Sequence, residues 1–379
     1  MEAPVQALRN LGIEYKHVFS CDVCPFARAT IAANFPHEIM YEDVTKRNNA
    51  RAPAVDVYVA GFPCQPFSSA GLRQGFEDLR GRGTIFFDVL DYIKRQKPRV
   101  FVLENVRGLQ QINNGRYFAA IMEALTTLRL YNISTGLMNT KDHGIPHHRV
   151  RTYIVGIRKD ADRGSFRFPE PIPCAKLSHF LEPKPKASIA RSLPPPTQTN
   201  ARFNVVEVKR ELRRKGSDPS QVDMVIDCDS TPRFRKTMDG ISPCITCGRK
   251  AGHWVTSRGR RMFKTEMMRL QGMDPLKFKV VVSANQLGHQ LGNTMSVNVL
   301  ERLLCVLLPA AGLVRDQLPD RWATGVAVRA LASTRNLNFA KRFGCKRVRG
   351  ELLPNIANRK RKCPSGTKFP PGSSFKRAR

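Results

Sequence analysis

Acidic residues are scarce in this chain. Its 379 residues include 31 Asp and Glu against 63 Lys and Arg, so the formal net charge is +32. The last segment, Leu331–Arg379, holds 14 basic residues and one acid, and the rest of the chain still carries +19. An excess of this size implies a polyanionic partner, and nucleic acid is the usual one.

Long hydrophobic runs are also missing. No apolar segment approaches the ~18–20 residues of a membrane span, and the N-terminus lacks the hydrophobic stretch of a signal peptide. The hydrophobic fraction of 41% is nevertheless ordinary for a folded protein, which excludes a chain disordered throughout. We therefore expect an intracellular protein with no membrane partner.

The ten cysteines lack the spacing of a zinc site. Two Cys-x-x-Cys pairs occur, Cys21 with Cys24 and Cys244 with Cys247, but 220 residues separate them. Reduced cysteines and no bound metal are the favoured interpretation. A more local group leaves a metal site open as the minor alternative: Cys228, Cys244, Cys247 and His253.

Buried strands and amphipathic helices alternate through the first 160 residues. Strands are expected at 15–21, 54–61, 99–103 and 151–157, and helices up to 33, over 83–96 and over 117–128. This alternation predicts an α/β fold with a parallel, doubly wound sheet, whose strands bind ligands at their carboxyl ends.

Composition divides the chain into four parts. The sheet domain covers residues 1–167, and a basic, proline-rich, loop-rich insert covers 168–257. The chain returns to the sheet domain over 258–315, where a long apolar helix is expected near 290–308. Residues 316–379 are expected to form a basic, disordered tail.

Two strand ends carry reactive side chains. The strand 54–61 runs into Gly61-Phe62-Pro63-Cys64-Gln65-Pro66-Phe67-Ser68, and the strand 99–103 runs into Glu104-Asn105-Val106. A cysteine braced by two prolines at a strand end suits a nucleophile, which must be both exposed and immobile. A cysteine at a strand end more often packs in the core without a chemical role. The neighbouring Glu104 favours a catalytic role only modestly.

These segments resemble motifs of the cytosine-5 DNA methyltransferases. Gly61–Ser68 is similar to the family's Pro-Cys-Gln motif, and Glu104–Val106 to its Glu-Asn-Val motif. Four further blocks follow the family's order along the chain. They are Arg82–Phe87, Pro146–Arg151, Arg269–Gly272 and Gln290–Asn293. The resemblance covers about residues 10–310 and implies a Rossmann-like methyltransferase sheet with a smaller target-recognition region.

The resemblance also implies the catalytic residues. Cys64 would add to carbon 6 of cytosine, so that carbon 5 becomes nucleophilic enough to take a methyl group. Glu104 would give a proton or a strong hydrogen bond to N3. Arg151 would hold the cytosine O2, and Arg149 would support the catalytic loop.

The implied substrate is double-stranded DNA, with the target base flipped out of the helix. Gln65 and Ser68 would contact DNA from the loop that follows the nucleophile. In the insert, Arg233, Arg235 and Lys236 are candidates for phosphate contacts. Ordinary solvent-exposed charge is the competing explanation for all three.

The implied methyl donor is S-adenosylmethionine. Asp22 would hold its ribose and Asp43 its adenine. The remaining candidates are Val23, Val44, Pro63, Ile85, Asn293 and Thr294. Each acid considered alone is as easily a helix cap or a solvated side chain.

Two departures from the family pattern leave alternatives open. The first strand with its glycine-rich turn is not seen before Met1-Glu2-Ala3-Pro4, and His147 stands where the family has glutamine. We therefore also consider a catalytically inactive DNA-binding relative, and a tRNA cytosine-5 methyltransferase. The chain is expected to be monomeric, and its basic tail predicts a nuclear location in a eukaryote or a cytoplasmic one otherwise.

Overall fold

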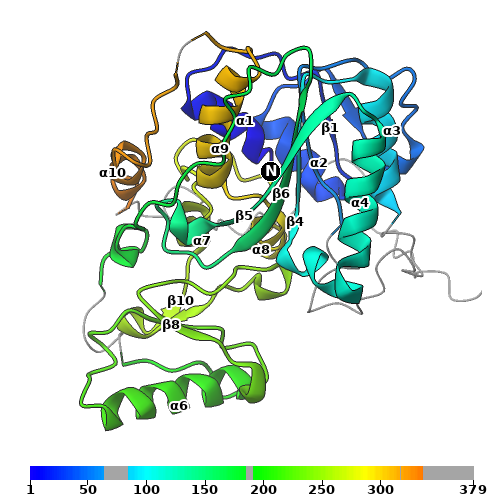
Figure 1. Ribbon diagram of the computed structural model, residues 1–379. Helices are drawn as coiled ribbons and strands as arrows, with labels where there is room; N and C mark the ends of the chain where they lie inside the picture. The colour runs from blue at the N-terminus through cyan, green and yellow to red at the C-terminus, as the bar shows by residue number, and fades with distance from the viewer. Residues whose placement is uncertain (64–83, 185–190, 316, 336–379) are drawn as a thin grey trace, which may run out of the picture. The chain divides into compact units, whose positions relative to one another are not determined.

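The computed structural model describes residues 1–63, 84–184, 191–315 and 317–335. Its main sheet has the order β3-β4-β6-β5 (Figure 1). The strands are β3 (Val57–Gly61), β4 (Val100–Val106), β5 (Tyr131–Asn139) and β6 (Val150–Arg158). β4 is almost wholly buried, as its continuous run of apolar residues predicts.

The main sheet is mixed and not parallel throughout. β3 and β4 are parallel, whereas β6 runs antiparallel to both β4 and β5. The sequence analysis missed β5 and predicted only parallel strands. Only ten residues join β5 to β6, too few for the helical crossover that a parallel pair needs.

A second, two-stranded sheet lies beside the first. β1 (Phe19–Cys21) pairs in parallel with β2 (Ile39–Tyr41), and α2 (Pro25–Asn34) connects them. β1 and β3 are not hydrogen-bonded to each other in the described part of the chain. Both strands instead line one cavity of about 1570 Å³.

Helices cover both faces of the main sheet (Figure 1). On one face, α3 (Ile85–Gln96) and α4 (Arg116–Thr127) enclose a core that includes Phe86, Tyr92 and Ile121. The larger core on the other face contains α1 (Ala3–Asn10) and α9 (Val297–Ala310). Between the insert and α9 lie α7 (Lys264–Leu270) and α8 (Ala284–Asn293).

The segment Ala284–Ala310 is long and apolar enough to cross a membrane by composition alone. In this structure 83% of its most hydrophobic window is buried inside the protein. Its hydropathy is thus accounted for by packing in the larger core, where Leu300, Leu303 and Leu304 of α9 are completely or almost completely inaccessible.

The insert has more regular structure than its composition indicates. It contains α6 (Thr199–Arg214) and the strands β7 (Met224–Ile226), β8 (Thr237–Asp239) and β9 (Trp254–Val255). β10 (Arg260–Arg261) completes a four-stranded sheet of order β10-β9-β7-β8. Val205 and Val208 of α6 pack against Ile226 and Trp254, so the insert has its own small core.

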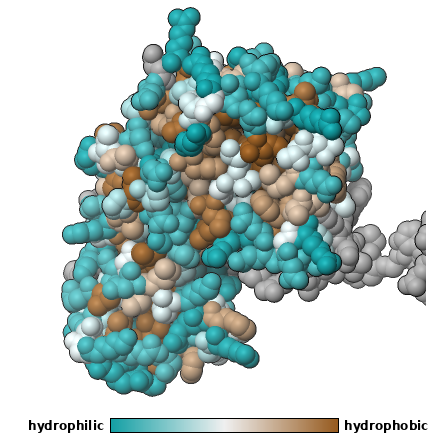
Figure 2. Space-filling view, in the orientation of Figure 1, coloured by the Kyte–Doolittle hydropathy of each residue, from teal (hydrophilic) through white to brown (hydrophobic). Residues whose placement is uncertain are grey.

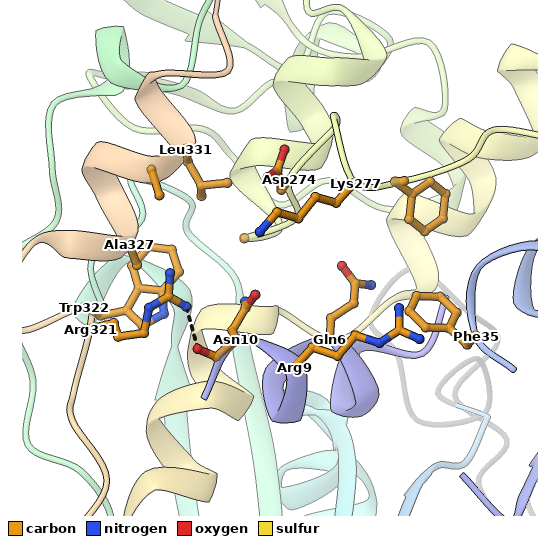
Figure 3. Close-up of a pocket in the computed structure, with 13 residues that line it drawn as sticks. Gln6, Arg9, Asn10, Phe35, Asp274, Lys277, Arg321, Trp322, Ala327 and Leu331 are labelled. Carbon is orange, nitrogen blue, oxygen red and sulfur yellow. Dashed lines mark hydrogen bonds between the residues drawn. The ribbon is translucent and has the colours of Figure 1, made fainter. Parts of the chain in front are cut away.

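The ordered fold continues beyond the predicted start of the tail at residue 316. Trp322 and α10 (Val326–Ala332) belong to the larger core, and one compact unit extends to Asn336. Arg321 donates a hydrogen bond to the backbone oxygen of Asn10, across a cavity of about 170 Å³ between α1 and α10 (Figure 3). α1 and α10 therefore line the same cavity, and Arg321, which precedes α10, links this segment to the end of α1.

Short 3-10 helices complete the described chain. They lie at Val44–Lys46, Arg107–Gln110, Ile112–Gly115, Thr140–Asp142, Leu177–His179, Pro232–Phe234, Cys247–Arg249 and Thr256–Arg258.

Candidate active site

Most of the predicted cofactor residues line the large cavity between β1 and β3. Six of the eight do so, and they lie near the carboxyl ends of β1, β2 and β3 or at the start of α3. They are Asp22, Val23, Asp43, Val44, Pro63 and Ile85. Carboxyl ends of strands are where an open α/β sheet binds its ligands.

The two acids in this cavity are held as hydrogen-bond acceptors. Asp22 Oδ1 accepts from the backbone N–H of Cys24 at 2.8 Å, and Asp43 Oδ1 accepts from the N–H and hydroxyl of Thr45. Those bonds to Thr45 lower the pKa of Asp43. Val23 lies beside Asp22 with 74% of its surface exposed. Fixed carboxylates beside an exposed apolar side chain fit a nucleoside, whose hydroxyls and amine donate and whose base needs an apolar contact.

Asn293 and Thr294 are not among the residues that line the cavity. Asn293 is exposed and contacts His289, whereas Thr294 is buried and its backbone oxygen accepts from Arg149 at 2.7 Å. Their neighbour Met295 packs closely on Gly61, where an added Cβ would come within 3.0 Å of Met295 Cε. The segment thus reaches the cavity wall through Met295.

Glu104 and Arg151 form an ion pair at the carboxyl end of the main sheet. Arg151 Nε lies 3.1 Å from Glu104 Oε1, and the two side chains are 13% and 12% exposed. Glu104 stands opposite Gly61 in the register of β3 and β4, and Gly61 lines the cavity. The structure therefore brings these two predicted catalytic residues together beside the predicted cofactor site.

Arg149 is buried and binds two other segments of the chain, the insert and the end of α8. Its guanidinium donates to the backbone oxygens of Ile245 at 3.0 Å, Gly292 at 3.2 Å and Thr294 at 2.7 Å. Burial, followed by the nearby Arg151, lowers the pKa of Arg149. This residue ties the strand β6 to both the insert and the end of α8, which agrees with a supporting role.

Cys244 is a site residue that the sequence analysis did not identify as such. Its Sγ lies 3.7 Å from Arg149 Nη1 and 3.8 Å from Arg151 Nη2. Burial alone would raise its pKa, but Arg151 and Arg149 outweigh burial, so the pKa of the thiol lies below its ordinary value. The Cys-x-x-Cys spacing drew attention to Cys244, but nothing in the sequence placed it between two arginines.

His147 replaces the family's glutamine without losing its hydrogen-bonding capacity. Its Nδ1 lies 3.1 Å from the backbone oxygen of Leu270, and its Nε2 accepts from the N–H of Ile245 at 3.0 Å. Burial and the charges of Arg149 and Arg151 hold its pKa well below the usual value, so the ring is neutral. A neutral ring that donates at one nitrogen and accepts at the other matches what a glutamine amide offers.

The predicted nucleophile lies outside the described residues. Cys64, Gln65 and Ser68 all fall within 64–83, whereas Pro63, directly before Cys64, lines the cavity. The chain therefore leads from the cavity wall directly into the predicted catalytic loop.

The predicted DNA contacts differ in their availability. Arg233 and Lys236 are exposed, and Phe234 beside Arg233 is 69% exposed. Arg235 is instead paired with Glu211 of α6 at 3.0 Å. Arg233 and Lys236 are thus the two exposed candidates, and the Arg233 guanidinium lies 5.7 Å from the centre of the Phe234 ring.

The structure does not support a metal site formed by Cys228, Cys244, Cys247 and His253. Within the ranges that the structure describes, no group of three or more His, Cys, Asp or Glu side chains is arranged to hold an ion. Cys244 is directed to the two arginines, and Cys228 lies in the core of the insert.

The α/β sheet, the cavity at its strand ends with an acid–arginine pair beside it, and the basic insert agree with an α/β enzyme that acts on a nucleic acid. The comparisons identify which kind. A sequence model described as C-5 cytosine-specific DNA methylase matches residues 5–308, and the chain belongs to this family. It is a DNA cytosine-5 methyltransferase.

Individual relatives agree with this assignment. The type II methyltransferase M.NgoBI of Neisseria gonorrhoeae is 33% identical over 77% of this chain and 86% of its own length. M.BsuFI of Bacillus subtilis is 33% identical over 82% and 70%. M.NlaIV of Neisseria lactamica is 42% identical, but the match spans only 47% of this chain and 42% of that protein.

Solved structures show the same fold. The S. pombe Dnmt2 methyltransferase has a TM-score of 0.54 at 16% identity, and the match covers 81% of this chain and 94% of that one. A putative DNA modification methyltransferase from an E. coli prophage also has a TM-score of 0.54, at 18% identity, over 82% and 95%. The relatives named as type II methyltransferases favour DNA methylation over the tRNA alternative.

Proposed function

We propose that this chain methylates carbon 5 of a flipped cytosine in double-stranded DNA through a covalent adduct with Cys64. The observation that carries the proposal is the convergence of six candidate cofactor residues on one cavity whose rim bears the Glu104–Arg151 pair. S-adenosylmethionine, bound by Asp22, Asp43 and their apolar neighbours, would supply an electrophilic methyl group.

The protein's own residues would activate the base. The Cys64 thiolate adds to carbon 6, while Glu104 gives a proton or a hydrogen bond at N3 so that the ring does not accumulate negative charge. Arg151 holds both Glu104 and the cytosine O2 in place, and Arg149 fixes β6 relative to the insert. Carbon 5 then takes the methyl group and gives its proton to water, a proton that Glu104 gave to N3 returns to Glu104, and the thiolate leaves carbon 6.

The insert would hold the DNA. Arg233 and Lys236 are exposed and contact phosphates, which contributes affinity but no sequence information. We further propose that the enzyme acts as a monomer. A nuclear location in a eukaryotic cell stays a prediction from the basic tail.

Replacing the nucleophile tests the covalent step. Cys64→Ser is expected to abolish methyl transfer while DNA binding persists, because a hydroxyl without a strong adjacent base is a poor nucleophile. The measurement is trapping on duplexes that contain 5-fluorocytosine, with binding followed separately by fluorescence anisotropy. A covalent adduct formed by the serine variant would refute the assignment of Cys64.

Replacing the acid tests the role of Glu104. Glu104→Gln keeps the shape but removes the exchangeable carboxyl proton, so single-turnover methylation is expected to slow by about 10²-fold or more. Affinity for the methyl donor, measured by calorimetry, should be unchanged and controls for misfolding. A variant that turns over at the normal rate would show that Glu104 is structural.

A further inference from the structure

Phe234 leaves most of its ring in contact with solvent. It is 69% exposed, the largest fraction for any phenylalanine in the part of the chain that the structure describes. The residue belongs to the short 3-10 helix Pro232–Phe234 of the insert. An aromatic ring that leaves water gains hydrophobic free energy in proportion to its buried area, so this ring is available to bind a partner.

The chain on the C-terminal side of this ring is held by bonds to two other elements. Arg235, the next residue, forms an ion pair with Glu211 of α6 at 3.0 Å. The backbone oxygen of Lys236 accepts a hydrogen bond at 2.9 Å from the N–H of Asp227, which directly follows β7. The ring therefore projects from an anchored turn, and binding costs little conformational entropy.

Positive charge lies on both sides of the ring. The guanidinium of Arg233 is 5.7 Å from the centre of the Phe234 ring, and Lys236 is exposed two residues further on. Hydrophilic side chains cover most of the surface over α6 and β8 in the space-filling view (Figure 2). An exposed ring between two cations matches a nucleic acid, which presents flat base faces beside its phosphates. A protein surface is the competing partner, but the two cations favour the polyanion.

The segment that carries the ring lies near the active site. The pKa of His148 is lowered by burial first, then by Lys141, and also by the charge of Lys236. His148 directly precedes Arg149, and its N–H donates to the backbone oxygen of Ser242 at 2.8 Å. Two residues separate the ring from Lys236, a span of at most about 7 Å along the backbone. The ring is therefore close to the strand that carries the two active-site arginines.

We propose that Phe234 enters the DNA duplex beside the target cytosine and stacks on a neighbouring base, in the space that the flipped cytosine leaves. Flipping removes one base from the stack at a cost in free energy. An aromatic ring placed on the newly exposed base face recovers part of that cost, whatever the base is. Phe234 is thus a positioning residue for flipping, and the inference rests on the proposed methylation of DNA.

The first test measures flipping on the duplex that the wild type methylates, with 2-aminopurine in place of the target cytosine. The fluorescence of 2-aminopurine rises when it leaves the stack. Phe234→Ala is expected to reduce this rise, and to slow single-turnover methylation of the ordinary duplex at least about fivefold, because one stacked base is lost. Phe234→Trp keeps a flat ring and should retain most of both signals.

A mispaired target separates a role in flipping from a structural role. A mispaired cytosine leaves the stack at lower cost, so the defect of Phe234→Ala should shrink to less than about twofold on such a duplex. The matched control is Phe203→Ala. Phe203 is 51% exposed in the same insert, but it lies one turn from Glu207 on α6, and its loss should leave both signals unchanged.

The outcomes distinguish this inference from the proposed function. A wild-type chain that binds no DNA would contradict both. If the wild type flips and methylates its target and Phe234→Ala does so equally well, only the role of Phe234 is refuted, and a protein becomes the partner of its ring. Equal defects of Phe234→Ala on the paired and mispaired duplexes, or the same defect in Phe203→Ala, would indicate a structural effect and also overturn the inference.

Discussion

The guanidinium groups of Arg149 and Arg151 lie near a single carboxylate, that of Glu104, beside the cavity. The positive charges therefore outnumber the negative ones there. Arg151 is paired with Glu104, whereas Arg149 donates hydrogen bonds to neutral backbone oxygens and to Cys244. A thiolate at Cys244 would balance the second arginine. The direction of its pKa shift agrees with that charge state.

Cys244→Ser is therefore expected to lower kcat roughly tenfold, or about 1.4 kcal/mol, because a neutral hydroxyl does not balance the two arginines. The difference should be present above the pKa of the thiol and disappear at lower pH, where the wild-type thiol is also neutral. The ionisable groups near the thiol are Arg149, Arg151, His148 and His253.

The measurement is kcat as a function of pH for wild type and Cys244→Ser. The matched control is Cys247→Ser, the other half of the Cys-x-x-Cys pair, which should behave as wild type. If the kcat of Cys244→Ser differed from that of wild type by the same factor at every pH, the defect would come from altered packing and not from the lost thiolate charge.

The sequence identified the residue types of this site but not their contacts. Glu104, Arg149 and Arg151 were recognised because they lie in local motifs, where spacing alone identifies them. Cys244 lies 93 residues from Arg151 in the chain, and only the folded insert brings them together. His147 looked like a departure because a residue name does not show which atoms donate and accept.

At the scale of elements, α8 packs unusually close to the insert. A Cβ added at Gly292 would lie 2.1 Å from Cys247 N, and one at Gly288 would lie 2.1 Å from Lys250 O. Both contacts are with backbone, which has little freedom to move. The two glycines, four residues apart, therefore form one smooth face of the helix against residues 246–250.

Gly292→Ala is expected to destabilise the protein by about 1–3 kcal/mol, because the added methyl group must displace backbone. The control is Gly248→Ala, where the nearest atom to an added Cβ is Thr246 Oγ1 at 3.9 Å. Urea unfolding of both variants measures the difference. Equal unfolding midpoints for the two variants would show that the interface adjusts at no cost.

Helices and strands with a continuous or regularly spaced apolar pattern were predicted from the sequence, whereas those with a weak apolar pattern were missed. β3, β4, β6, α3 and α4 were expected close to their observed bounds, because their side chains meet a core directly. β5 was missed since Ser134, Thr135 and Gly136 interrupt its apolar pattern, and its pairing with β6 supplies the stability instead. α10 was missed because the basic residues around it resemble a disordered tail.

For the whole molecule, buried histidines govern stability in acid. Burial and Arg302 lower the pKa of His143 to about 4, and burial also lowers the pKa values of His147, His148 and His253. Each ring therefore resists protonation more in the folded state than in the unfolded chain, where a histidine takes up a proton below about pH 6.5. Their contribution is fully present above that pH.

Stability should therefore fall as the pH decreases from about 6.5 towards 4, and His143 alone accounts for on the order of 3 kcal/mol. Urea midpoints at pH 8, 6.5 and 5 measure the slope. His143→Asn, which keeps an acceptor for Arg302 but does not titrate, should reduce it. A flat profile between pH 6.5 and 5 would contradict the prediction.

The contact between α1 and α9 sets an order of events during synthesis. Asn10 donates to Glu301 across 291 residues, and α1 is only eight residues long, too short to be stable alone in water. At ~5–20 residues per second, a ribosome needs about 15–60 s to reach α9 after it has made α1. α1 therefore cannot dock until α9 has emerged from the ribosome, and its docking is a late event in folding.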